Sequence, residues 1–325
     1  MKKLIIICGM PRSGTTWLGK IFDSHPEILY RHEPDAGGKL NLLPLFTEAW
    51  VEEELKFIKQ FISELESHTR VNQVSKFPIF KKIRESDIHF QVRKAYLTAL
   101  KIASRYFGNF SAYEMLPNQS DMTIVWKSIE SLGRMPIMAQ AVQELGIEAY
   151  FIHIIRHPCG QLNSTLRGQA KQVFTGNYNA AEDEPLFKLL ASSSQAQLYE
   201  LTVSQFQQMN AEQRLTWRWA LMNDFALRLM ENKPNYFKVR YEDICQEPEL
   251  TTKELFTFCK LGWNEQTAHF LEMSTKQDVS DYYSVIKNPL NSANAWRKKL
   301  SEQQINDIFA VSEKTLSGKL YLPRD

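Results

Sequence analysis

The chain is poor in cysteine, has no long apolar run and carries no large excess of charge of either sign. Its four cysteines lie far apart and form no C-x-x-C pair, which argues against a disulfide framework and favours reduced thiols in a cytoplasmic protein. The formal net charge is +2 at pH 7, whereas a general binder of nucleic acid or anionic membranes needs a strong basic excess. Any cationic site must therefore be local. The cysteines are Cys8, Cys159, Cys245 and Cys259.

Membrane-spanning and metal-binding patterns are also missing. No window approaches the length of a membrane span, and the apolar run 4–8 is too short for a signal peptide. His153 and His157 are four residues apart, but their segment is strand-like and runs into Pro158, so they share no helical face. We therefore expect no transmembrane anchor, no metal site and a cytoplasmic location.

Short apolar runs alternate with helical patterns along the 325 residues. This alternation predicts an α/β fold in which helices flank a parallel sheet, and the glycine-bounded loop at 9–17 points to the phosphate-loop NTPase-like type. With 43% hydrophobic residues, we expect a single domain over 1–325. The four expected core strands are 4–8, 123–126, 149–155 and 236–239, with helices over 13–24 and 135–144 and a short run, 28–30, returning beside the sheet.

Two long segments, about 45–118 and 170–215, are predicted to be helical insertions. The first contains apolar residues at heptad-like spacing, which is typical of amphipathic helices. These helices either select the acceptor or serve as structural packing. The spaced residues are Val51, Leu55, Ile58, Ile62 and Leu65.

A glycine-bounded loop, GMPRSGTTW at 9–17, follows the first apolar run. Gly9 and Gly14 let the chain curl so that backbone N–H groups face an oxyanion, while Thr15 and Thr16 begin a helix with a partly positive N-terminus. The pattern predicts a phosphate or sulfate site. Nucleotide hydrolases require a Lys where this chain has Thr15, and here the cation is Arg12.

The run Pro-Arg-Ser-Gly-Thr-Thr resembles the 5′-phosphosulfate loop of the sulfotransferases, which use 3′-phosphoadenosine-5′-phosphosulfate (PAPS) as donor. The resemblance implies that PAPS is the co-substrate, that adenosine 3′,5′-bisphosphate is a product and that no metal is required. It assigns donor binding in this loop to Pro11, Arg12, Ser13, Gly14, Thr15, Thr16 and Trp17.

A second pair of residues supports an anion site. Arg156 follows the third expected strand, and Ser164 lies eight residues further on, in the next helix. A strand-end guanidinium and a hydroxyl at the crevice form an oxyanion clamp, although a strand-end Arg can also be a surface ion-pair partner. The resemblance assigns this pair to the 3′-phosphate of PAPS.

The resemblance extends to Arg240-Tyr241-Glu242-Asp243 and to Trp296-Arg297. It places Tyr241 and Trp17 beside the adenine, although Trp17 also lies on the apolar stripe of its helix. Arg297 would close over the 3′-phosphate, or would simply belong to a solvated helix end.

Sulfuryl transfer needs cations at the transferring group and a base for the acceptor hydroxyl, and we expect Arg12 to act catalytically by facing the bridging oxygens of the phosphosulfate. Lys127, just after the second expected strand, resembles the Lys that family members direct at that group; a solvent-facing Lys is the alternative. The family's hormone- and drug-sulfating branch has a His two residues later, where this chain has Ile129. We therefore favour Glu33, 21 residues after Arg12, with His32 as the competing base.

The leading interpretation is an enzyme that transfers a sulfuryl group from PAPS to a hydroxyl of a carbohydrate, or of another small-molecule or lipid acceptor. One alternative is a nucleotide kinase or NTPase of the phosphate-loop class, against which Thr15 and the Arg156/Ser164 pair argue. The other is a non-catalytic adenosine-bisphosphate-binding protein. No nucleic-acid partner is expected.

Overall fold

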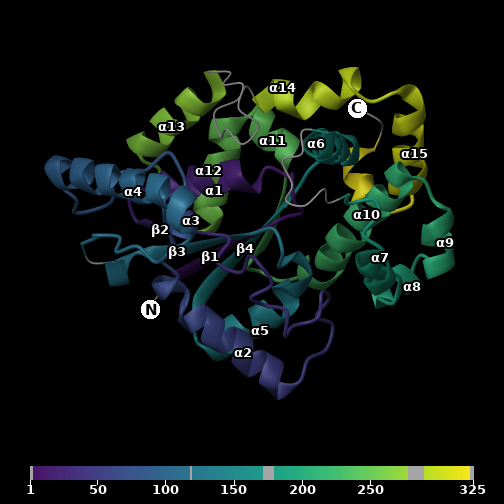
Figure 1. The fold of residues 1–325 in the computed structure, drawn as a ribbon, viewed down its shortest axis with the longest axis horizontal. Helices are drawn as coiled ribbons and strands as arrows, with labels where there is room; N and C mark the ends of the chain where they lie inside the picture. Colours follow the sequence, from purple (N-terminus) through teal and green to yellow (C-terminus); the bar gives the residue numbers. More distant parts are fainter. Residues whose placement is uncertain (1–2, 118, 171–178, 277–288, 323–325) are drawn as a thin grey trace.

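The structure is a computed structural model that describes residues 3–117, 119–170, 179–276 and 289–322. Its centre is a parallel sheet of five strands in the order β2-β3-β1-β4-β5, flanked by helices (Figure 1). The α/β fold class is therefore confirmed. The strands are β1 Lys3–Cys8, β2 Ile28–His32, β3 Thr123–Ser128, β4 Glu148–Ile155 and β5 Tyr236–Arg240.

The expected set of four core strands was incomplete. The run at 28–30 is not merely beside the sheet, because it belongs to β2, an edge strand whose Ile28 pairs with Thr123 of β3. Its shortness hid it, since five residues followed by a proline-containing turn give little periodicity. The other four strands lie where the apolar runs predict them.

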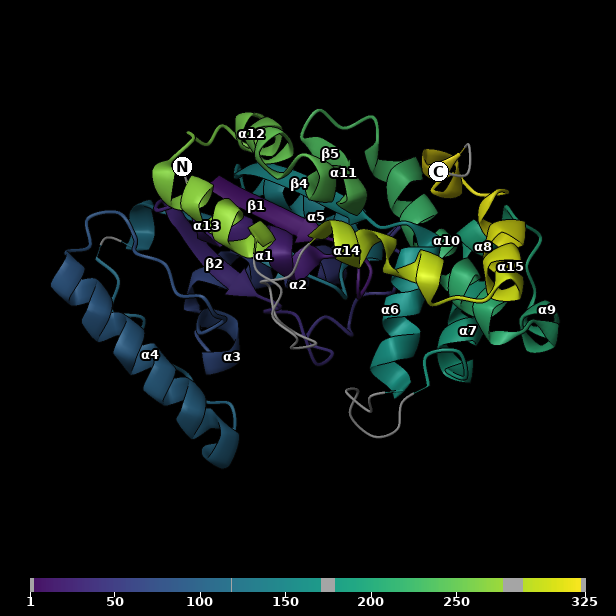
Figure 2. The same cartoon turned by 90° about the horizontal axis from the view of Figure 1, so that it is seen from above.

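Helices enclose the sheet on both faces (Figures 1 and 2). The helices are α1 Thr15–Asp23, α2 Glu52–Ser63, α3 Val71–Val74, α4 Asp87–Phe107, α5 Met135–Glu144, α6 Pro158–Ala170, α7 Glu184–Ala191, α8 Ser194–Gln197, α9 Val203–Gln208, α10 Ala211–Met230, α11 Tyr241–Gln246, α12 Pro248–Phe258, α13 Glu265–Lys276, α14 Pro289–Asn294 and α15 Glu302–Ser312. The predicted helix at 135–144 matches α5, and the one at 13–24 is slightly shorter, as α1.

Side chains of β1 alternate between two hydrophobic cores. Leu4 and Ile6 pack with residues of α2, α5 and α10, whereas Ile5 and Ile7 pack with residues of α1, α12 and α13. A strand that is buried on both faces must be apolar at every position. This requirement explains the uninterrupted apolar run before the loop.

The first predicted insertion carries α2, α3 and α4. Leu55, Ile58 and Ile62 of α2 are buried as their spacing predicts, and so is Leu65 after the helix. Val51 does not join them: it precedes the helix and is 61% exposed. In the second insertion the described residues, from 179 on, form α7, α8, α9 and the start of α10, while 171–178 lie outside the described residues.

A buried ion pair attaches the first insertion to the edge of the sheet. Arg31 of β2 is fully buried, and its guanidinium donates to Glu114 Oε1 at 3.1 Å and Oε2 at 2.7 Å. The same guanidinium donates to the carbonyl oxygens of Leu65 and Glu66. The insertion thereby covers the outer edge of β2.

Glu114→Gln should lower the free energy of unfolding by about 3 kcal/mol, because it leaves the Arg31 charge buried without its counter-charge. Asp121→Asn is the matched control, since it removes the partner of the exposed Arg84 and should cost about 1 kcal/mol or less. Urea unfolding at pH 7 measures both. Equal small losses would show that the Arg31 charge is not dependent on Glu114.

Candidate active site

The predicted site residues come from the carboxyl ends of all five strands. The glycine loop follows β1, Glu33 follows β2, Lys127 lies near the end of β3, Arg156 follows β4 and Tyr241 follows β5. Because the strands are parallel, these ends lie along one edge of the sheet, where open α/β folds bind ligands.

The glycine loop turns sharply before α1. Arg12 and Gly14 have φ angles of 73° and 93°, and the Ser13 N–H donates to the Met10 carbonyl oxygen at 3.1 Å. That amide is therefore used within the loop, contrary to the expectation that successive N–H groups face an anion. Gly14 caps α1 without a side chain, so no cap side chain occupies the first-turn N–H groups. Within the described part of the chain, the buried Ser13 Oγ has no hydrogen-bond partner.

Arg156 and Ser164 both meet the loop at Arg12. Arg156 Nη1 donates to the Arg12 carbonyl oxygen at 3.0 Å, and Arg12 Nε donates to Ser164 Oγ at 3.1 Å. Arg156 Nη2 donates to the Ser292 carbonyl oxygen at 2.6 Å, while its Nε is buried without a partner in the described residues. The structure therefore brings together the two motifs that the sequence predicts to bind anions.

Gln161 of α6 was missed by the sequence reasoning. Its Nε2 donates to the Pro11 carbonyl oxygen at 2.9 Å and holds the loop from the side of α6. A polar residue between Arg156 and Ser164 was the available signal, but glutamine alone indicates no particular chemistry.

Tyr241 lies buried between the loop and Arg156. The Arg156 guanidinium carbon is 4.6 Å from the centre of its ring. Added to Gly14, a Cβ would come within 2.3 Å of Tyr241 Cδ2, so only glycine fits there. Trp17 contacts Tyr241 edge to face, and its Nε1 donates to Ser274 Oγ at 3.1 Å. Trp17 is thus a buried member of the apolar stripe of α1, and its contact with an adenine stays a prediction.

Trp296 and Arg297 lie in a short 3-10 turn, Ala295–Lys298. Trp296 is buried and stacks on His157, with the ring centres 4.7 Å apart. Arg297 is exposed and lies over the ring of Trp296 at 4.7 Å. The Arg297 guanidinium therefore lies at the surface, over the ring of Trp296. The stacking of Trp296 on His157 connects this turn to the start of α6.

Lys127 is buried and forms an ion pair with Glu33, whose side chain is 23% exposed. The structure thus does not show the solvent-facing Lys that was the alternative. Glu33 has a φ of 49°, and its N–H donates to the Lys127 carbonyl oxygen at 2.8 Å. The backbone and the side chain of Glu33 are therefore both held against the end of β3.

His32 is the neighbour of this pair. Its Nε2 is 3.9 Å from Glu33 Oε1, and its Nδ1 is 2.9 Å from the Tyr30 hydroxyl. The pKa of His32 lies well below its usual value. The larger cause is burial, and the positive charges of Lys127 and Lys76 add to it. The ring is therefore neutral at pH 7.

Asp35 is a further buried carboxylate that the sequence analysis did not single out. It accepts hydrogen bonds from Trp126 Nε1 at 3.1 Å and from the hydroxyls of Ser128 and Ser131. These bonds tie the turn after Glu33 to the end of β3, beside Lys127. Its place two residues after Glu33 was the only signal, and an acidic residue in a turn is common.

The two histidines excluded as a metal pair have separate structural roles. His153 contacts the Tyr236 hydroxyl at 2.7 Å and Asn223 Oδ1 at 2.9 Å, and His157 packs against Trp296. In the part of the chain that the structure describes, no group of three or more His, Cys, Asp or Glu could hold a metal ion. Within the same residues, no helix has the length and apolar character needed to cross a membrane.

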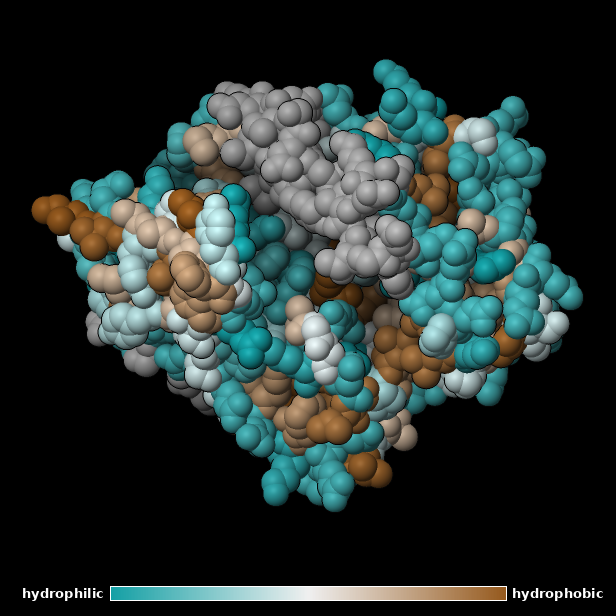
Figure 3. Space-filling model, viewed as in Figure 1, coloured by the Kyte–Doolittle hydropathy of each residue, from teal (hydrophilic) through white to brown (hydrophobic). Residues whose placement is uncertain are grey.

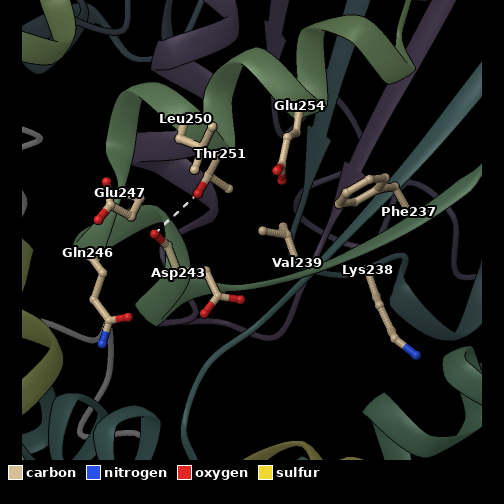
Figure 4. Close-up of a pocket in the computed structure, with 9 residues that line it drawn as sticks. All are labelled: Phe237, Lys238, Val239, Asp243, Gln246, Glu247, Leu250, Thr251 and Glu254. Carbon is tan, nitrogen blue, oxygen red and sulfur yellow. Dashed lines mark hydrogen bonds between the residues drawn. The ribbon is translucent and has the colours of Figure 1, made fainter.

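A cavity of about 350 Å³ lies between β5, α11 and α12 (Figure 4). It is lined by Phe237, Lys238, Val239, Asp243, Gln246, Glu247, Leu250, Thr251 and Glu254. None of the predicted site residues is among them. This cavity is therefore not the candidate active site.

A phosphate-type loop and a buried ion pair lie together at the carboxyl end of a parallel sheet, an arrangement typical of α/β proteins that bind anionic ligands. The model of the Sulfotransferase family matches residues 5–265, and the chain belongs to that family. It is therefore an enzyme of the sulfotransferase class.

The chain is similar to carbohydrate sulfotransferase 1 of Mus musculus, with 22% identity over 347 aligned positions that cover 96% of this chain and 76% of the relative. Among solved structures, it is similar to the sulfotransferase domain from the curacin biosynthetic pathway, with 15% identity and a TM-score of 0.44, covering 95% of this chain and 97% of that one. It is also similar to mouse sulfotransferase SULT7A1 complexed with PAP, with 12% identity and a TM-score of 0.46, covering 100% and 90%.

Gly14→Ala should destabilise the protein by about 3 kcal/mol, because the new Cβ would overlap the Tyr241 ring at a left-handed φ. Gly146→Ala is the control: its φ is also positive, at 63°, but nothing lies within 4 Å, so only the backbone strain of about 1 kcal/mol remains. Urea unfolding compares the two. Losses of equal size would contradict the close approach of Tyr241 to the loop.

Stability should fall as the pH drops below about 6.5, the usual pKa of an unfolded histidine. Burial lowers the pKa of His153 to about 4 in the folded protein. Between pH 6.5 and 4, the unfolded chain therefore binds a proton at this histidine and the folded chain does not. His153→Gln should therefore reduce the slope of unfolding free energy between pH 6.5 and 4.5 by about 1 kcal/mol per pH unit. Urea unfolding across this range measures the slope, and His269→Gln, at an exposed position, controls for the substitution. An unchanged slope in His153→Gln would contradict the prediction.

Proposed function

We propose that this sulfotransferase transfers a sulfuryl group from PAPS to a hydroxyl of a carbohydrate, or of another small-molecule or lipid acceptor, with Glu33 as general base. The observation that carries the proposal is the Lys127–Glu33 ion pair, which lies at the same sheet edge as the Arg12 loop. A cation and a carboxylate are thereby held together beside an anion-binding loop.

The donors around the loop fit an anion with two separate phosphate groups. Ser13 Oγ and Arg156 Nε are buried polar atoms without partners in the described residues, and such atoms are costly unless a ligand binds them. We assign residues 11–16 to the 5′-phosphosulfate, and Arg156 and Ser164 to the 3′-phosphate. Tyr241 and Trp17 would border the adenine, and Trp296 and Arg297 would close the site. PAPS supplies the activated sulfuryl group.

Ser164 is held against the loop, because its oxygen accepts a hydrogen bond from Arg12 Nε at 3.1 Å. Nη1 and Nη2 of Arg156 donate to carbonyl oxygens, and its buried Nε, which has no partner in the described residues, is available to a ligand. Both side chains are therefore oriented before the donor binds, which lowers the entropic cost of binding.

Lys127 supports both halves of the reaction. Its ammonium group has three N–H donors, so it can hold Glu33 and still stabilise charge on the transferring group. Glu33 takes the proton of the acceptor hydroxyl and becomes neutral. His32 is the weaker candidate, because burial, together with the charges of Lys127 and Lys76, lowers its pKa, and protonation would add a third positive charge there.

The acceptor class rests on sequence similarity. The mouse relative is a carbohydrate sulfotransferase, and this supports a sugar hydroxyl as acceptor. We also propose a cytoplasmic location, supported by four buried cysteines that form no disulfide.

Labelled PAPS offered with a panel of sugars, phenols, peptides and lipids should give a sulfated sugar. Calorimetry should show binding of adenosine 3′,5′-bisphosphate and none of ATP·Mg²⁺ at the same concentration. Micromolar affinity for ATP without affinity for the bisphosphate would favour the nucleotide kinase alternative. Tight bisphosphate binding without turnover of any acceptor would favour a non-catalytic binding protein.

Glu33→Gln should lower kcat by about 10² to 10⁴, the usual contribution of a general base, and leave the Kd for the bisphosphate unchanged. His32→Gln should lower kcat by less than about tenfold if its role is only to pack beside Glu33. Initial rates with the best acceptor measure the effects, and Glu144→Gln, at an ion pair on the surface of α5, is the control. A large loss in His32→Gln with little loss in Glu33→Gln would make His32 the base.

A further inference from the structure

Helix α4 has a second apolar face that packs against nothing in the described structure. Its apolar residues at 88, 92, 95, 99, 102 and 106 alternate in spacing between four and three, which places them along one side of a helix. All six are exposed: Ile88 is 80%, Ile102 54% and Tyr106 81% exposed. We call these six residues the α4 stripe.

The opposite side of α4 attaches the helix to the protein. Leu97 packs with Val71 and Ile79, and the buried Arg93 forms an ion pair with Glu85. The α4 stripe is therefore not needed to hold the helix in place. α4 lies at the periphery, where it extends away from the sheet (Figures 1 and 2).

The apolar surface continues beyond the stripe. Of the seventeen large hydrophobic residues that are exposed in the described structure, eight fall between 77 and 113. They include Phe107 and Tyr113 next to the C-terminal end of α4. Figure 3 shows apolar groups exposed over α4, at the left of the molecule. A clustered apolar surface of this kind marks an interaction site.

The same segment is strongly basic. Residues 76–107 contain eight Lys and Arg but two Asp and Glu, whereas the remainder of the chain has more acidic than basic residues. Lys82 and Arg93 are buried with carboxylate partners, but Lys94 and Arg105 are exposed and follow the flank of the stripe. Because Lys81 and Arg84 also have carboxylate partners, Lys94 and Arg105 form the basic surface beside the stripe.

We propose that α4 docks the protein on an anionic lipid bilayer, with the α4 stripe in the interface and Lys94 and Arg105 at the lipid phosphates. A helix with a basic flank, an apolar face and aromatic residues at one end has the chemistry of an interfacial helix. Such a helix lies on the membrane and does not cross it. The expected absence of anionic-membrane binding, which came from the average charge of the chain, does not apply to this face.

Charge disfavours a second copy of the chain as the occupant. Two stripes facing each other would bring Lys94 and Arg105 of both copies together, and Asp87, the acidic residue of α4, already pairs with Lys81. An anionic lipid surface meets the same side chains with opposite charge. The docking also does not depend on the proposed reaction, since none of the stripe residues belongs to the candidate active site.

Sedimentation with vesicles tests the proposal in the absence of PAPS. The protein should bind vesicles of phosphatidylcholine with about one third phosphatidylglycerol, bind pure phosphatidylcholine far less, and be released by salt. The double variant Ile88→Ser/Ile102→Ser should bind the anionic vesicles about tenfold more weakly. Lys94→Glu/Arg105→Glu should lose about fivefold for each basic side chain removed. Leu198→Ser, at a 62% exposed leucine outside α4, is the matched control and should bind normally.

Two results would overturn the proposal. The first is equal binding of wild type and the Ile88→Ser/Ile102→Ser variant to the anionic vesicles. The second is a stable dimer of the wild type that this variant makes monomeric, with no vesicle binding by either, because the stripe would then join two copies. Calorimetry with adenosine 3′,5′-bisphosphate shows whether each variant keeps its donor site. Failure of docking is thereby separated from failure of the proposed function.

Discussion

The guanidinium of Arg156 joins the parts of the chain that make the candidate active site. It donates to the Arg12 carbonyl oxygen in the loop and to the Ser292 carbonyl oxygen in the C-terminal part, and it lies over the ring of Tyr241. A planar fork of five N–H donors is suited to such a junction, and a lysine in its place would not be. Because the guanidinium meets a carbonyl oxygen of the loop, the loop conformation depends on a residue 144 positions away.

Buried charge is the second constraint on the candidate active site, at the carboxyl ends of the strands. Lys127 and Asp35 are almost fully buried, and buried charges are costly without partners. Glu33 neutralises Lys127, while Trp126 and two serine hydroxyls satisfy Asp35. The carboxylates of Glu33 and Asp35 therefore both attach the turn after β2 to β3. Glu33, the general base that we propose, is oriented by its backbone N–H as well as by its side chain. This orientation is what transfer to a positioned hydroxyl requires.

The charge of the molecule is unevenly distributed, and the two proposals use different parts of it. The candidate active site brings Arg12, Lys127 and Arg156 to the carboxyl ends of the strands, where Arg156 Nε is buried without a partner in the described residues. The surface of α4 combines exposed cations with an exposed apolar stripe. Lys101 of α4 lies on the attached side of the helix, where its Nζ donates to the Ser75 carbonyl oxygen at 2.9 Å.

The sequence by itself determined the α/β class, four of the five strands and the loop, because a strand buried on both faces must be apolar and a left-handed turn at Gly14 requires glycine. It also singled out Arg12, Arg156 and Ser164 as candidates, because a phosphate-type loop occurs together with a strand-end guanidinium and a hydroxyl eight residues further on. Only the tertiary structure decided that Lys127 is buried against Glu33, that Asp35 and Gln161 hold the loops, and that α4 is apolar on two opposite sides. The reason is that burial and pairing depend on residues far apart in the chain, and local spacing carries no record of them.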